Sequence, residues 1–184
     1  MEDISTKSQQ ILEKYIKNES LRKHCYAVES AMRFYARLLN ENENLWAAAG
    51  LLHDIDYEMY PDTHPNTAVP ILQEAGFDKD FIDAILGHAY PVRTDVPRET
   101  KLAKYLYACD EITGFVNAYS LMKPDGFESI NPKSVIKRMK DKAFARNVNR
   151  DDIRKGAEEL GIDLADHIQN IVLAMKSDPR VNNR

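Results

Sequence analysis

The stretch AAAGLLHDIDYEMY, residues 47–60, begins as a run of small and apolar residues and continues directly into His53, Asp54 and Asp56. Burying a carboxylate costs free energy unless a hydrogen-bonding partner or a metal ion compensates its charge. A segment with the composition of a core helix therefore ends in groups that a core tolerates only when they are paired. Its partners must come from elsewhere in the chain.

The overall composition is that of a soluble globular protein. The chain has 184 residues, 43% hydrophobic and 29% charged, with a net charge of −4. This length fits one domain, which we expect to span residues 1–184. No apolar run is long enough to cross a bilayer and no basic, apolar leader is present, so we expect a cytoplasmic protein with no membrane partner. Cys25 and Cys109 lie among apolar residues and are expected to be reduced.

Helical periodicity recurs along the chain, and no stretch shows the sustained alternation of a strand, so an all-α fold is expected. Helices are predicted over about 43–54, 150–160 and 163–176. Several others are marked by residues that commonly cap a helix N-terminus: Ser20 or Asn18, Asp78, Thr100, and Asn131 followed by Pro132.

Two segments need separate interpretation. Within 61–76 we expect a short or kinked helix that ends at Gly76, because Pro70 removes a backbone donor. The loop 122–132 separates a front part, about 20–120, from a basic helical part, about 131–176. Both parts are expected to belong to the same helical bundle.

Four polar residues lie in phase with the apolar faces of four different predicted helices. His53, for example, follows Trp46 by seven residues, a spacing that places both side chains on one helix face. One inward histidine is usually a hydrogen-bonded core residue. Four inward groups together with Asp54 indicate a shared metal site, because imidazole and carboxylate suit Fe, Zn, Mn and similar ions. The four are His24, His53, His88 and Asp110.

The order of these residues resembles the H…HD…D signature of the HD-domain superfamily of metal-dependent phosphohydrolases. Further segments also resemble HD domains, including those of the HDIG type and a group of predicted HD hydrolases. They are HPNTAVPIL (64–72), FIDAILGHA (81–89), ACDEITGFVNA (108–118) and VIKRMKDKAFARNVNR (135–150). The first two add His64 and His88 to the candidate ligands, so that the whole pattern reads H…HD…H…H…D.

The resemblance implies a single-domain, all-helical bundle around a metal centre. It implies one ion held by His24, His53, Asp54 and Asp110, and a second held by His64 and His88 with Asp54 bridging. One or two divalent ions (Fe, Mn, Zn, Ni, Co or Mg) are thus the expected cofactors. Tyr57 stands where HD-GYP domains have a lysine, and no GYP triplet follows, which argues against a cyclic-di-GMP phosphodiesterase.

These residues suggest hydrolysis of a small phosphate ester or nucleotide. A metal ion lowers the pKa of bound water, and the resulting hydroxide is the expected nucleophile. Asp54 is the expected catalytic residue, bridging the ions and polarising the centre.

An anionic substrate also needs cations. Residues 133–155 contain nine basic and three acidic side chains, and most of these should face solvent. We expect Lys140, Lys142 and Arg146 to face the metal cleft and bind phosphate. Few aromatic residues interleave with these cations, which argues against a nucleic-acid partner.

Three other interpretations are open at this stage. The ligand pattern also resembles that of mixed-valence di-iron oxygenases such as myo-inositol oxygenase. The chain could instead be a metal-stabilised binding or signalling module without turnover, or its polar residues could form a buried hydrogen-bond network without a metal. Asp56 either orients a ligand or ends a helix. No heptad seam predicts an oligomeric state.

Overall fold

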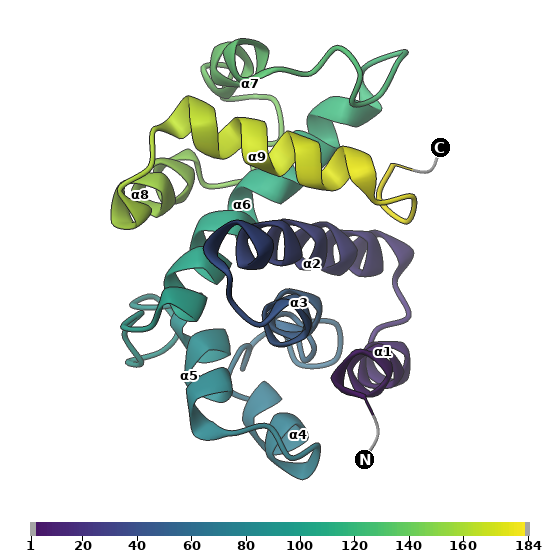
Figure 1. Cartoon of the computed structure of the whole chain (residues 1–184), viewed down its shortest axis with the longest axis vertical. Coiled ribbons are helices and arrows are strands. Elements are labelled where there is room, and N and C mark those ends of the chain that lie inside the picture. Colours follow the sequence, from purple (N-terminus) through teal and green to yellow (C-terminus); the bar gives the residue numbers. More distant parts are fainter. Residues whose placement is uncertain (1–2, 183–184) are drawn as a thin grey trace.

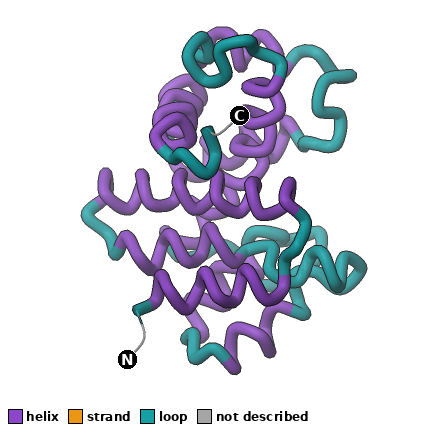
Figure 2. The backbone as a smooth tube through the Cα atoms, turned by 90° about the vertical axis from the view of Figure 1, so that its right-hand side faces the viewer, coloured by secondary structure: helices purple, strands orange, loops and turns teal. Residues whose placement is uncertain are grey.

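The computed structural model describes residues 3–182, which form nine α-helices and no strand (Figure 1, Figure 2). The predicted all-α class is confirmed. The helices are α1 (Ile4–Tyr15), α2 (Glu19–Leu39), α3 (Glu43–Leu52), α4 (Ala68–Glu74), α5 (Lys79–Gly87), α6 (Lys101–Leu121), α7 (Pro132–Met139), α8 (Arg150–Leu160) and α9 (Leu164–Ser177). Within the described residues, no helix combines the length and apolarity needed to cross a membrane.

Side-chain caps define where most of the predicted helices begin. Asn18, rather than Ser20, caps α2, and its side chain accepts a hydrogen bond from the Leu21 N–H at 3.0 Å. Three other side chains likewise accept a hydrogen bond from the N–H of the residue three positions further along the chain: Asp78, Thr100 and Asn131. Helix α1 was not anticipated from the sequence, because its buried face is narrow and consists of Ser8 and Leu12.

The segment 61–76 forms turns followed by a short helix, as Pro70 predicts. The chain turns through residues 61–67 before α4 begins at Ala68. Pro70 is the third residue of α4, where a backbone N–H would have no partner within the helix. The helix is followed by Gly76 in a left-handed conformation, with φ of 76°.

The two longest helices, α2 and α6, hold the other elements together. Helix α2 packs against α3, α6 and α9, while α6 also contacts α5, α8 and α9. In Figure 1, α6 runs from the group formed by α3, α4 and α5 toward the group formed by α7, α8 and α9. The basic C-terminal part therefore packs directly on the elements of the front part.

Two glycines allow helices to approach at backbone distance. A Cβ atom on Gly50 of α3 would lie 2.8 Å from backbone atoms of Glu29 in α2. A Cβ on Gly156 of α8 would lie 2.7 Å from the Cα of Ala108 in α6. The first contact seats the end of α3 against α2, and the second seats α8 against α6.

Candidate metal centre

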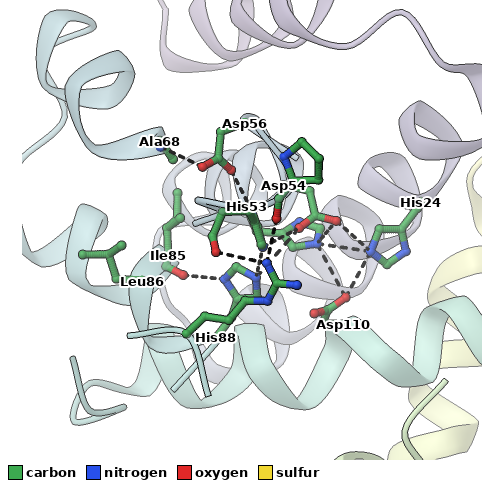
Figure 3. Close-up of polar contacts among 12 residues, drawn as sticks. His24, His53, Asp54, Asp56, Ala68, Ile85, Leu86, His88 and Asp110 are labelled. Carbon is green, nitrogen blue, oxygen red and sulfur yellow. Dashed lines mark hydrogen bonds and ion pairs between the residues drawn. The ribbon is translucent and has the colours of Figure 1, made fainter. Parts of the chain in front are cut away.

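All six candidate ligands converge on one place in the fold, and Figure 3 labels five of them. They come from the first turns of α2, the ends of α3 and α5, the turns before α4 and the middle of α6. Three are buried histidines, and the other three are partly exposed toward a common cavity. The six residues are His24, His53, Asp54, His64, His88 and Asp110.

Asp54 lies at the centre of this cluster and faces two sets of histidines. Its Oδ2 atom lies 3.4 Å from His53 Nε2 and 3.7 Å from His24 Nε2. Its Oδ1 atom lies 3.4 Å from His64 Nε2 and 3.8 Å from His88 Nε2. Each set, together with Asp54, is compact enough to hold a metal ion. One carboxylate thus serves two neighbouring groups of potential ligands, one with each oxygen.

Asp110 adds a second carboxylate to the His24 side of the centre. Its Oδ1 lies 3.0 Å from His24 Nε2 and 3.5 Å from His53 Nε2. Burial opposes ionisation of Asp110, but its interactions with the adjacent His24 and His53 hold its pKa well below the usual range. Burial likewise disfavours charge on His53, yet Asp54 and Asp110 raise its pKa well above the ordinary value. This side of the centre therefore strongly favours positive charge.

The orientation of the imidazole rings shows which nitrogen atoms are available to a metal. His53 and His88 each donate from Nδ1 to the backbone carbonyl three residues earlier. The Nδ1 of His64 donates to Asp56 at 2.7 Å. Because these oxygens only accept hydrogen bonds, a neutral ring carries its proton on Nδ1 and a lone pair on Nε2. All three Nε2 atoms point into the cluster.

The histidines on the second side show directly why a cation fits. The Nε2 atoms of His64 and His88 are 3.2 Å apart. Burial, with the neighbouring His53, lowers the pKa of His88 to about 4, so its ring is neutral near pH 7. Two lone pairs facing each other at this distance repel unless a metal ion or a proton lies between them. The donor set of imidazole and carboxylate is one that divalent transition metals prefer.

Asp56 connects the second group of ligands to the fold. The carboxylate is fully buried; one oxygen accepts from His64, and the other accepts from the Ala68 N–H at 3.0 Å. Ala68 is the first residue of α4. Of the two roles considered for Asp56, these contacts match the one in which it orients a ligand.

A cavity of about 530 Å³ opens above the cluster and is lined by five of the six candidate ligands, with His53 buried behind them. Its wall includes two cations, Arg93 and Lys155. Arg93 is held in place because its Nη1 donates to the Pro61 carbonyl at 2.7 Å. An apolar side of the cavity contains Tyr57, Tyr90, Pro91 and Val92.

Sequence reasoning assigned no role in the site to Arg93 or Lys155. Arg93 lies in an irregular segment whose path no local pattern indicates. Lys155 precedes Gly156, and a glycine within a helix signals a close approach to a neighbour. That signal could have placed this turn of α8 beside the metal-site helices.

Glu111 links α6 to the start of α8 at the cavity wall. Its Oε2 accepts a hydrogen bond from the Asn149 N–H at 3.0 Å. Burial and the adjacent charge of Asp110 raise the pKa of Glu111 to about 7. The contact holds the beginning of α8 beside the metal centre.

Lys140, Lys142 and Arg146 do not face the metal centre, contrary to expectation. They line a neighbouring depression that shares Val148 and Asn149 with the cavity. The sequence showed their charge and not the path of the loop that carries them. This path depends on hydrogen bonds from Arg150 to the loop carbonyls and on the contact of Arg150 with the Phe115 ring of α6.

An all-α chain in which one carboxylate faces two groups of histidines has the features of a helical metal-centre protein. The HD domain family matches residues 21–114, slightly more than half of the chain and the part that contains all six candidate ligands. The chain belongs to the HD domain family, whose members are in general metal-dependent phosphohydrolases that bind divalent metals. Searches of curated proteins and of solved structures each found no significant match.

Proposed function

We propose that this HD domain is a phosphohydrolase that removes a phosphate group from a small phosphate ester or nucleotide. The observation that carries the proposal is the position of Asp54, whose two oxygens face two groups of potential metal ligands. The same centre opens into a cavity with cations on its wall. This combination suits an anionic substrate that reacts at a metal-held phosphorus centre.

The side chains divide into metal ligands and substrate-binding groups. Divalent ions at such a centre lower the pKa of water and neutralise charge on a phosphoryl group. His24, His53 and Asp110 would hold one ion and His64 and His88 the other, with Asp54 shared between the two groups. Arg93 and Lys155 would bind phosphate oxygens from the cavity wall, where charge-assisted hydrogen bonds are strong.

A covalent cysteine nucleophile is not part of this proposal. Cys25 follows His24 in the sequence but is fully buried. Burial, together with the charge of Asp54, raises the pKa of its thiol well above the usual range. Burial also raises the pKa of Cys109 above its ordinary value. Both thiols stay protonated near neutral pH and are unsuited to attack.

The decisive experiment replaces the shared carboxylate. Asp54→Ala should abolish phosphate release from a panel of phosphate esters and reduce the bound metal from the wild-type level of about two ions per chain. Metal content is measured by elemental mass spectrometry, and circular dichroism checks that the helices remain. Asp62→Ala, at an exposed position near the site, is the matched control. An active, metal-replete Asp54→Ala protein would overturn the proposal.

The same ligand set also suits a di-iron oxygenase, so the assay is run with and without dioxygen. Phosphate release that is equal in both atmospheres supports hydrolysis. Turnover that requires dioxygen and iron would replace the hydrolase proposal with the oxygenase alternative.

A further inference from the structure

A basic depression adjoins the metal cavity. It has a volume of about 600 Å³ and lies between the end of α7, the loop of residues 140–149 and the first turns of α8. Val148 and Asn149 line both this depression and the metal cavity, so the two hollows are neighbours. The charged residues that line it are Lys140, Lys142, Arg146, Arg150, Asp151 and Arg154.

Three of the exposed cations in this depression have no acidic partner. Arg154 pairs with Asp151 at 3.2 Å. Within residues 3–182, by contrast, no carboxylate forms an ion pair with Lys140, Lys142 or Arg146, all of which are exposed. Uncompensated cations that share one concave surface create a positive potential there and attract anions. They do so in a chain whose net charge is −4.

The loop that carries these three cations is held by Arg150. Its Nη1 donates to the carbonyls of Ala145 and Val148, both at 2.6 Å, and its Nη2 donates to the carbonyls of Asp141 and Phe144. Ala145 is accordingly in the left-handed region, with φ of 42°.

The guanidinium also lies over the Phe115 ring of α6, 5.0 Å from its centroid. Because the loop carbonyls converge on Arg150, the side chains of Lys142 and Arg146 are left to line the depression. The basic wall is therefore built by tertiary contacts to the helix that also carries Asp110.

We propose that this depression binds a second anionic group of the substrate, so that the enzyme prefers phosphate esters that carry another phosphate. The inference rests on the proposed phosphohydrolase activity, since it assumes that one phosphate lies at the metal centre. Because Val148 and Asn149 line both hollows, one molecule at the metal centre would have to extend past these two residues to reach the cations. Lysine and arginine are the side chains that most often bind phosphate.

The test compares monophosphates and bisphosphates of linear diols over a range of chain lengths, using the metal-loaded enzyme. At the length that spans both hollows, we expect kcat/KM for the bisphosphate to exceed that for the monophosphate by about tenfold to a hundredfold. The double variant Lys140→Glu/Arg146→Glu should bring this ratio close to one, mainly through KM. Lys133→Glu/Lys137→Glu is the control, since it changes the net charge equally at exposed positions of α7 outside the depression.

The outcomes separate this inference from the function on which it rests. Equal kcat/KM for both ester series in the wild type, or a bisphosphate preference that survives Lys140→Glu/Arg146→Glu, refutes the second subsite and leaves the hydrolase proposal intact. Stimulation of monophosphate turnover by inorganic phosphate, without competition against the bisphosphate, would assign the depression to a separate effector and also refute it.

If no ester is hydrolysed, the proposed activity fails, and equilibrium dialysis of the bisphosphate decides the fate of the subsite. If bisphosphate binding is lost in Lys140→Glu/Arg146→Glu and kept in the control variant, the second subsite is supported. Equal binding in both double variants, or none in the wild type, refutes it.

Discussion

Replacing Asp56 with asparagine tests whether this buried carboxylate sets the protonation of a metal ligand. Asparagine has the same shape as aspartate. Its carbonyl oxygen can still accept a hydrogen bond from the Ala68 N–H, which in the wild type lies 3.0 Å from Asp56 Oδ2. Its amide NH₂ must then lie where Oδ1 stands, 2.7 Å from His64 Nδ1. Because two N–H donors cannot face each other, His64 must move its proton to Nε2.

The consequence falls on one group of ligands. His64 Nε2 faces Asp54 Oδ1 and His88 Nε2, and a protonated Nε2 cannot bind a metal. Loss of an orienting contact behind a metal ligand typically weakens binding by about 10- to 100-fold, or about 1.4–2.7 kcal/mol. Asp56→Asn should weaken the binding of the ion on the His64 side by this amount and leave the binding of the ion on the His24 side unchanged. Folding should be little affected, since the backbone contact is kept.

Metal affinity is measured by titration against a competing chelator, with the stoichiometry verified by elemental mass spectrometry. Asp62→Asn removes the same charge at an exposed position of the same segment, and this variant should bind both ions like the wild type. A folded Asp56→Asn protein that retains two ions at wild-type affinity would falsify the tautomer argument. Weakening of both ions to the same extent would contradict the separation into two ligand groups.

Two further predictions concern the helices that support the centre. His167 is fully buried, its Nε2 donates to the Ala108 carbonyl at 2.8 Å, and burial lowers its pKa. Its contribution to stability is therefore complete above the unfolded-state pKa of about 6.5 and is lost as pH falls toward the lower folded-state value, by at most about 1.4 kcal/mol per pH unit. His167→Gln should lower the free energy of unfolding by about 1–3 kcal/mol near neutral pH. The difference between wild type and variant should narrow as the pH falls. Urea unfolding at several pH values measures this difference, and a value that does not change with pH contradicts the prediction. Gly156→Ala should lower the free energy of unfolding by about 1–3 kcal/mol, because the new methyl group meets the backbone of Ala108. Gly114→Ala is the control, since no atom lies within 4 Å of the added Cβ. It should leave the stability unchanged or raise it by up to about 1 kcal/mol. Equal urea midpoints for the two glycine variants would show that α8 can move away from α6 without cost.

Local signals were sufficient for much of the helical frame. The caps at Asn18, Asp78 and Asn131 lie at the helix starts they predicted, because a cap acts through hydrogen bonds within its own turn. The inward phase of His24 and His53 likewise followed from spacing alone. A helix buries a defined face, so residues in phase with apolar neighbours must point toward the same interior.

Contacts between distant segments were not available from such local signals. Arg93 reaches the metal cavity from an irregular segment, and its position depends on the Pro61 carbonyl far back in the chain. Lys142 and Arg146 were recognised as basic, but their direction is determined by the carbonyls that converge on Arg150. A charge pattern predicts that cations are present. The direction of Lys142 and Arg146 depends on how the loop closes around Arg150, which itself lies against Phe115 of the distant helix α6.

The run of small residues before His53 serves the metal centre as well as the core. Gly50 lets α3 approach α2 closely enough that any side chain would collide with the backbone of Glu29. Its carbonyl then accepts the Nδ1 proton of His53, which directs Nε2 to within 3.1 Å of the corresponding atom of His24. A substitution at Gly50 would push α2 and α3 apart and would at the same time displace this carbonyl. Helix packing and ligand orientation on the His24 side therefore depend on the same residue, whereas Asp56 orients His64 on the other side.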